Sequence, residues 1–215
     1  MLELRDISVR YGAVTAVSNV CLTLKPGQLT VLDGHHGAGK SSFLKAAIGA
    51  VISTGQVLLS NQIISRRNPS KMANLGVVLA PEGRHIFPTL TTRENLEFAL
   101  AVTGRPASLD QILTYFPDLE PLLSQPALSL SGGQAQMLSL ARAMLCTPKF
   151  ILLDEPLLGL SEQPKMKVWS AIQDMRRNGV GILVTGDHNI SDVTNVDQFM
   201  SISNSYLCEK IKNES

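Results

Sequence analysis

Three short segments of this 215-residue chain combine residue types that suit phosphate chemistry. They are GHHGAGKS at 34–41, LSGGQ at 130–134 and FILLDEP at 150–156. The first can hold phosphates on a turn that opens a helix, because glycines free the backbone amides to converge. The second begins a helix with a donor-rich tip, and the third places two carboxylates after an apolar strand. Together they predict a protein that closes on ATP and hydrolyses it.

Segment 34–41 matches the P-loop spacing G-x-x-x-x-G-K-S at every fixed position. Lys40 is expected to bridge the β- and γ-phosphates, and the Ser41 hydroxyl to bind Mg²⁺. The alternative is a glycine-rich turn that holds no ligand, but the apolar strand before it and the helix-forming residues after it favour the phosphate site. The predicted nucleotide-binding residues of this segment are Gly34, His35, His36, Gly37, Ala38, Gly39, Lys40, Ser41 and Ser42. No catalytic role is assigned to the two histidines.

Asp154 and Glu155 follow the apolar run FILL. On a parallel strand beside the P-loop, Asp154 is expected to hold Mg²⁺ through a water molecule. Glu155 is then placed to orient and deprotonate the attacking water, a contribution of about 10²- to 10⁴-fold. An acidic pair after an apolar strand is often only a strand end that faces solvent. The P-loop upstream favours the functional interpretation.

Hydrophobic patterning predicts the elements that must position these residues. Alternating apolar residues indicate strands near both 2–9 and 20–24, and apolar runs indicate strands at 29–32, 56–59, 75–79, 150–153 and 180–184. A helix is expected over 41–50, a turn at Gly55, a helix over 164–178 and a hairpin over 198–211 that turns at 204–205. Thr91 and Glu94 form a capping box that starts a helix running to about Val102. Residues 85–145 look mainly helical, which suggests a helical insert between two halves of an α/β core.

Composition excludes several classes of protein. The formal net charge is +1, so no strong field favours nucleic acid, and no nucleic-acid partner is expected. Three distant cysteines form neither a disulfide framework nor a zinc pattern. The N-terminus lacks the basic and apolar regions of a signal peptide, and no apolar run reaches the roughly 18 residues needed to cross a bilayer. We expect a soluble cytoplasmic chain that another chain holds at any membrane it serves.

The order and spacing of the three segments resemble the nucleotide-binding subunits of ATP-binding-cassette (ABC) proteins over essentially the whole chain. The resemblance implies one ABC ATPase domain over 1–215: a RecA-like P-loop NTPase α/β core, an antiparallel β subdomain and a helical subdomain near 85–145. It also implies that Ser131, Gly132, Gly133 and Gln134 of one subunit complete the ATP site of a second ATPase subunit. A loop-to-helix junction without such a role is the alternative for this segment. Integral membrane permease subunits would hold the pair on the cytoplasmic face of the membrane.

Other positions match the family less sharply. Tyr11 corresponds to the aromatic residue that stacks on adenine, with a tyrosine packed at a strand end as the alternative. His188 corresponds to the histidine that bonds the γ-phosphate, against a lone surface histidine. Segment 80–91, APEGRHIFPTLT, looks like the ATPases of branched-chain amino acid importers and their urea or amide relatives. Glu82 stands where most relatives have glutamine, and it is expected to reach Mg²⁺ or the attacking water unless it is only a solvated loop residue.

The chain also departs from the family. Leu157 follows the Asp-Glu-Pro motif where a serine is usual, so communication between the two ATP sites is expected to differ. Two alternatives stay open beside an importer ATPase. One is an ABC ATPase that works on DNA or ribosomes, although no coiled coil, tandem cassette or basic extension is visible. The other is a regulatory cassette that binds ATP but barely hydrolyses it. The resemblance to an importer ATPase also implies that the transported solute binds to other subunits and not to this chain.

Overall fold

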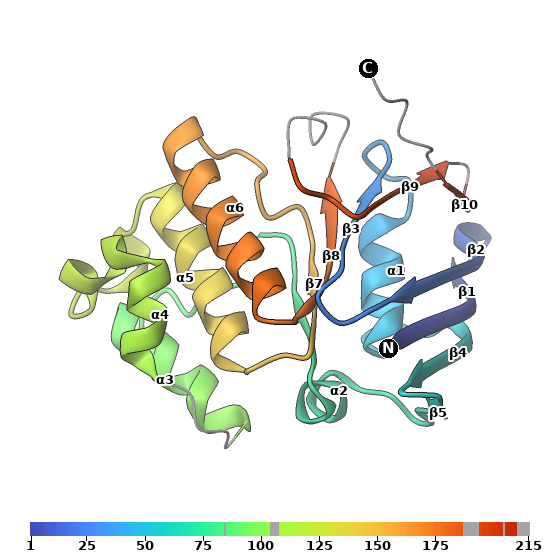
Figure 1. The fold of residues 1–215 in the computed structure, drawn as a ribbon, viewed down its shortest axis with the longest axis horizontal. Coiled ribbons are helices and arrows are strands. Elements are labelled where there is room, and N and C mark those ends of the chain that lie inside the picture. The colour runs from blue at the N-terminus through green and yellow to red at the C-terminus, as the bar shows by residue number, and fades with distance from the viewer. Residues whose placement is uncertain (84, 104–107, 187–193, 204, 210–215) are drawn as a thin grey trace.

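Two β-sheets with helices beside them make up the fold in the computed structural model, which describes residues 1–83, 85–103, 108–186, 194–203 and 205–209 (Figure 1). A four-stranded antiparallel sheet has the order β2-β1-β4-β5, and a six-stranded sheet has the order β10-β9-β3-β8-β7-β6. The strands are β1 (Leu2–Tyr11), β2 (Val14–Leu24), β3 (Leu29–Asp33), β4 (Thr54–Leu59), β5 (Gln62–Ile63), β6 (Val77–Ala80), β7 (Phe150–Leu153), β8 (Gly181–Gly186), β9 (Gln198–Ser203) and β10 (Tyr206–Glu209). The helices are α1 (Lys40–Ala47), α2 (Pro69–Leu75), α3 (Thr92–Thr103), α4 (Leu109–Tyr115), α5 (Gly132–Leu145) and α6 (Glu162–Arg177), with short 3-10 turns at Pro117–Leu122 and Ala127–Ser129.

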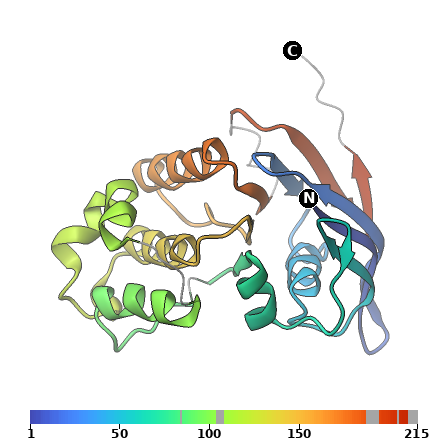
Figure 2. The same cartoon turned by 60° about the horizontal axis from the view of Figure 1, so that its bottom comes forward.

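The centre of the six-stranded sheet is parallel and covered on both faces. β3, β7 and β8 are buried along their whole length, as expected for strands that read as continuous apolar runs. Alternate residues point to opposite faces: Val31 and Ile151 join a core with the helices α3, α5 and α6, whereas Leu32 and Leu152 join a core with α1 and the antiparallel sheet. Figures 1 and 2 show α1 on one side of this sheet and α5 with α6 on the other.

The helical layer consists of α3, α4, α5 and α6. All of these helices except α6 are inserted between two neighbouring strands of the sheet. β6 and β7 pair in parallel, and the chain between them forms α3, α4, the 3-10 turns and α5. The capping box at Thr91 is confirmed, because the Thr91 N–H donates to Glu94 Oε2 at 2.7 Å and the Glu94 N–H to Thr91 Oγ1 at 3.1 Å. The α/β architecture with an antiparallel sheet and a helical insert is the one the sequence predicted.

Two local predictions were wrong. Gly55 lies inside β4 rather than at a turn; its φ is +88°, and a Cβ there would lie 2.5 Å from the Arg5 and Asp6 carbonyl oxygens of β1. Leu75 ends α2, a helix that the apolar run concealed, so β6 begins two residues later. Asp154 follows a parallel strand and lies beside the P-loop, as predicted, although β8 separates its strand β7 from the P-loop strand β3. The hairpin near the C-terminus is confirmed as β9 and β10.

Within the described residues, no helix combines the length and apolarity required to span a bilayer.

Candidate active site

The P-loop leaves the buried strand β3 and turns into α1, as its glycines predicted. Gly39 is the N-cap of α1 with φ of +101°, and a Cβ there would lie 2.1 Å from the Ala16 carbonyl oxygen of β2. Gly34 is equally confined, since its Cβ would lie 2.6 Å from the Ile202 carbonyl oxygen. Neither position accepts a side chain without moving backbone, which explains why glycine occupies both.

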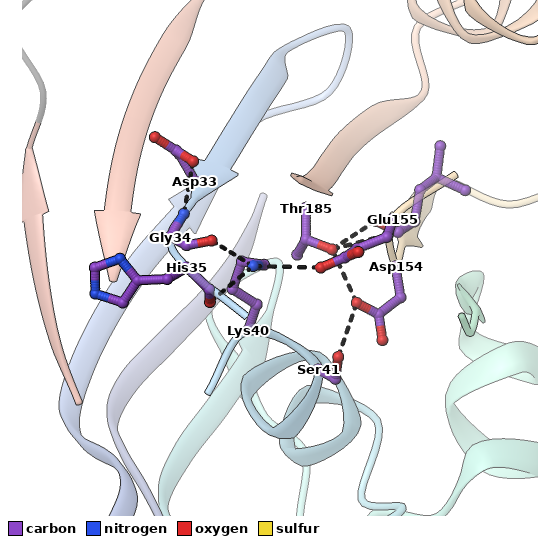
Figure 3. A network of polar contacts seen from close by, with 9 residues as sticks. Asp33, Gly34, His35, Lys40, Ser41, Asp154, Glu155 and Thr185 are labelled. Carbon is purple, nitrogen blue, oxygen red and sulfur yellow. Dashed lines mark hydrogen bonds and ion pairs between the residues drawn. The ribbon is translucent and has the colours of Figure 1, made fainter. Parts of the chain in front are cut away.

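Lys40 is the first residue of α1, and its side chain folds back over the loop (Figure 3). Its ammonium group donates to the carbonyl oxygens of Gly34 at 2.5 Å and His35 at 3.2 Å. It also pairs with Glu155 Oε1 at 3.3 Å, and the two side chains are only 4% and 9% exposed. The ion pair therefore joins the phosphate-binding segment to the acidic segment inside the protein.

Asp154 follows β7 and faces the start of α1 (Figure 3). Its Oδ1 accepts hydrogen bonds from Ser41 Oγ at 3.1 Å and from Thr185 Oγ1 at 2.8 Å. Its Oδ2 is buried and has no hydrogen-bond partner among the described residues. A buried carboxylate oxygen left in this state is costly unless a further ligand satisfies it. A hard cation such as Mg²⁺ prefers oxygen donors of this kind, so the residues present fit the ion.

Glu155 adopts a backbone conformation that is uncommon for residues other than glycine. Its φ is +48°, in the left-handed region, and its N–H donates to Thr185 Oγ1 at 3.0 Å. Such conformations cost on the order of 1 kcal/mol or more and persist where surrounding contacts enforce them, often at functional sites. Here the conformation turns the Glu155 carboxylate toward Lys40.

Of the two P-loop histidines, His35 joins this network through its backbone carbonyl. His35 and His36 are exposed, as is Gly37. The His35 carbonyl accepts from both Lys40 and the Ala38 N–H, whereas Figure 3 shows its imidazole pointing away from Lys40.

Tyr11 lies beside the P-loop helix, at the end of β1. Its hydroxyl is 3.4 Å from Ser42 Oγ, and half of the residue is exposed. An exposed aromatic ring next to a phosphate loop can offer an apolar face to a planar base. The structure thus places Tyr11 next to Ser42, and nucleotide binding by both residues stays a prediction.

Segment 130–134, LSGGQ, is called the signature segment below, and it lies apart from this network. Ser131 is the N-cap of α5; its Oγ accepts from the Gln134 N–H at 3.3 Å, and Gln134 Oε1 accepts from the Ser131 N–H at 2.9 Å. Gly132 and Gly133 form the first turn of α5, and a Cβ on Gly133 would lie 2.8 Å from Pro164 Cγ. Because α5 covers the face of the sheet opposite α1, these residues do not join the P-loop of their own chain (Figures 1 and 2).

Of the remaining candidates, Glu82 lies at the edge of the sheet that carries Asp154. Glu82 is exposed and comes two residues after β6, whose Ala80 carbonyl accepts from the Asp154 N–H at 2.9 Å. His188 lies outside the described residues. Leu157 packs against the helical core and supplies no hydroxyl.

A groove of about 370 Å³ opens between the β6 strand and the helical layer. Its lining is mainly apolar but includes Arg142 and His85. The Arg142 guanidinium donates to the His85 carbonyl oxygen at 2.6 Å and lies 4.7 Å from the centre of the Phe87 ring. Burial lowers the pKa of Arg142 from its ordinary value.

Sequence reasoning missed Thr185, which bonds both acidic residues. The only signal was a hydroxyl residue near the end of an otherwise apolar strand. That pattern is too common in buried strands to mark a site.

The fold and the site define an ATPase cassette, and the comparisons agree. Residues 17–158 match the family model described as "ABC transporter". The branched-chain amino acid transport ATP-binding protein BraG of Pseudomonas aeruginosa is 32% identical over 86% of this chain and 81% of its own length. The lipopolysaccharide export ATP-binding protein LptB of Haemophilus influenzae is 30% identical over 91% and 83%, and the zinc import ATP-binding protein ZnuC of a Jannaschia species is 32% identical over 97% and 81%.

Solved structures give the same result for the fold. The structure described as an ATP-binding subunit of an ABC transporter superposes with a TM-score of 0.85 at 25% identity, covering 97% of this chain and 90% of that one. A dimeric cassette bound to ADP and phosphate has a TM-score of 0.83 at 21% identity, covering 97% and 98%. The chain belongs to the ABC transporter family, and it is an ATPase of that family. The resemblance inferred from its motifs is thereby confirmed.

Proposed function

We propose that this chain is the ATP-hydrolysing subunit of a solute importer of the branched-chain amino acid, urea or amide type. The observation that carries the hydrolytic part is the buried network in which Lys40 and Ser41 meet Asp154 and Glu155 from a distant part of the chain. Support for the solute class comes from the 80–91 segment and the similarity to BraG. Relatives named for lipopolysaccharide export and zinc import are nearly as similar, so the solute class is the finer part of the proposal.

Each residue of the network has a distinct task in this proposal. Backbone amides of 34–41 and the Lys40 ammonium hold the phosphates of ATP, and Tyr11 packs against the base. Entry of the phosphates draws Lys40 away from Glu155, which frees that carboxylate. Glu155 then orients the attacking water and accepts its proton. Glu82, after the strand paired with β7, and His188, after β8, are proposed to act on the same water or on the γ-phosphate.

Ser41 and Asp154 are the proposed ligands of Mg²⁺. Ser41 Oγ and the unpartnered Asp154 Oδ2 are oxygen donors at the start of α1. The ion supplies positive charge that stabilises the charge developing on the transferred phosphoryl group.

A second ATPase subunit is proposed to complete the site. The Ser131 hydroxyl and the Gly132 and Gly133 amides are suitable donors for a γ-phosphate, yet they lie across the sheet from their own P-loop. Two subunits arranged head to tail would bring each signature segment onto the partner's P-loop. Membrane permease subunits are the second proposed partners, docked at the groove near Arg142 and holding the chain on the cytoplasmic face.

Nucleotide-dependent assembly tests the hydrolytic part. Glu155→Gln is expected to slow hydrolysis and trap an ATP-dependent dimer, either with itself or with a sister ATPase, which gel filtration detects as an earlier elution. No association with either partner contradicts the two-subunit site. Equal ATP turnover by wild type and Glu155→Gln supports the regulatory cassette instead. Co-purification from the host membrane identifies the attached permeases and hence the solute class.

A further inference from the structure

Thr185 is a polar residue buried completely in the six-stranded sheet, with an exposed fraction of 0%. It follows the apolar residues of β8, and its neighbour across the ladder is Leu32 of the P-loop strand. A hydroxyl in such a place needs hydrogen-bond partners, because its desolvation is otherwise uncompensated. Its two nearest partners belong to the proposed hydrolysis site.

One hydroxyl group connects the two acidic residues (Figure 3). Thr185 Oγ1 accepts from the Glu155 N–H at 3.0 Å and donates to Asp154 Oδ1 at 2.8 Å. The Leu153 carbonyl oxygen, at 3.4 Å, is the more distant acceptor for its single proton. The charged carboxylate is also the stronger acceptor, so the proton goes to Asp154.

The bond to Asp154 decides which carboxylate oxygen stays available. Ser41 and Thr185 both donate to Oδ1, so Oδ2 is left without a partner among the described residues. Without the Thr185 hydroxyl, the one donor left to Oδ1 in the described part of the chain is Ser41 at 3.1 Å. The carboxylate can then rotate, and its available oxygen is no longer held in one direction.

The bond from Glu155 supports an otherwise unfavourable backbone. Glu155 has φ of +48°, and its partly buried N–H donates to the threonine hydroxyl. Removing the acceptor leaves that N–H unsatisfied and weakens the restraint on the conformation that aims the carboxylate. The same hydroxyl thus fixes the direction of the proposed metal ligand and of the proposed base.

We infer that Thr185 is a positioning residue that couples the orientation of Asp154 to that of Glu155. The inference rests on the proposed function of those two residues. Thr185 touches no reacting atom itself; it acts through the carboxylates. Groups that orient metal ligands typically change metal affinity or activity by about 10- to 100-fold when removed.

Thr185→Val and Thr185→Ser test the inference. Valine keeps the branched shape without the hydroxyl, and serine keeps the hydroxyl without the methyl group. For Thr185→Val, we expect kcat for ATP hydrolysis to fall about 10- to 100-fold with KM for ATP changed less than about threefold. The affinity of Mn²⁺ for the protein with ADP, measured by electron paramagnetic resonance, should fall about tenfold. Thr185→Ser should restore both quantities.

Thr30→Val is the matched control. Thr30 is also a completely buried threonine of the same sheet, but its hydroxyl donates to Gln198 Oε1 at 3.3 Å, outside the site. It should alter stability while leaving kcat and Mn²⁺ affinity unchanged. Thermal unfolding of all variants confirms that each assay is made on folded protein.

Three results overturn the inference while the proposed function stands. These are a Thr185→Val variant with wild-type kcat and Mn²⁺ affinity, a variant that loses only thermal stability, and a Thr185→Ser variant as impaired as valine. The last result would assign the effect to packing of the methyl group. A wild-type protein that neither binds Mn²⁺ with ADP nor hydrolyses ATP overturns the proposed function together with the inference.

Discussion

The ion pair between Lys40 and Glu155 should contribute measurably to the stability of the nucleotide-free protein. The ammonium nitrogen and Oε1 are 3.3 Å apart, and both side chains are buried. At an effective dielectric constant of about 20, this separation corresponds to an attraction of about 5 kcal/mol before desolvation. Desolvation opposes much of it, although Lys40 retains the Gly34 and His35 carbonyls. We expect a net coupling of about 2 kcal/mol, within the range measured for close buried pairs.

A double-mutant cycle with Lys40→Met and Glu155→Gln measures this coupling. Urea unfolding without nucleotide gives the unfolding free energy of the four proteins, and the non-additive part is the coupling energy. The pair of Lys165 and Glu162 is a matched control, since it has the same 3.3 Å separation but side chains 41% and 84% exposed. There we expect about 0.3 kcal/mol, which salt should screen.

The size of the Lys40–Glu155 coupling energy and its change when ADP binds test this reasoning. A coupling below about 0.5 kcal/mol for the buried pair would falsify the reasoning, because it would mean that burial adds nothing to the interaction. Saturating ADP should reduce the coupling in the cycle, since the phosphates compete with Glu155 for Lys40. An unchanged coupling with bound ADP contradicts the proposed release of Glu155.

Other predictions concern glycine, pH and capping. Gly39→Ala should lower the unfolding free energy by about 3 kcal/mol in urea titrations. The new Cβ would lie 2.1 Å from a β2 carbonyl oxygen, and φ at this position is +101°. Gly37→Ala is the control, because its φ is +80° but the space around it is open, and it should cost only about 1 kcal/mol. The Thr91 backbone and hydroxyl hydrogen bonds lower the pKa of Glu94 below its usual 4.5, so this carboxylate stabilises the fold above that pH. The stability difference between wild type and Glu94→Gln should therefore shrink as the pH falls through the lowered pKa; a constant difference would exclude a role for the charge. Ser131→Ala should cost about 1 kcal/mol in thermal unfolding by removing the α5 cap, and no loss would show that the cap is dispensable.

Local features of the fold were readable from the sequence because they depend on contiguous residues. The P-loop turn, the capping box at Thr91 and the terminal hairpin each need only a few neighbouring side chains. One error arose where distant backbone sets the conformation: Gly55 suggests a turn, yet it is a strand residue whose missing Cβ admits the β1 carbonyls. The other concerns Leu75, whose apolar run suggests a strand, but which ends α2. Local signals mark that helix, because Asn68 is its N-cap and Pro69 lies in its first turn.

By itself, the sequence determined which groups could bind phosphate or act on it. They are the Lys40 ammonium, the Ser41 and Ser131 hydroxyls, and the Asp154 and Glu155 carboxylates, all in recognisable local motifs. Only the tertiary structure decided how they meet. Lys40 reaches Glu155 because β3 and β7 both pair in parallel with β8, so their carboxyl ends share one edge of the sheet. β8 lies between them and places Thr185 at that edge, where its hydroxyl contacts Asp154, a residue more than thirty positions away in the sequence. Such contacts follow from strand order and register, which no local pattern of residue types encodes.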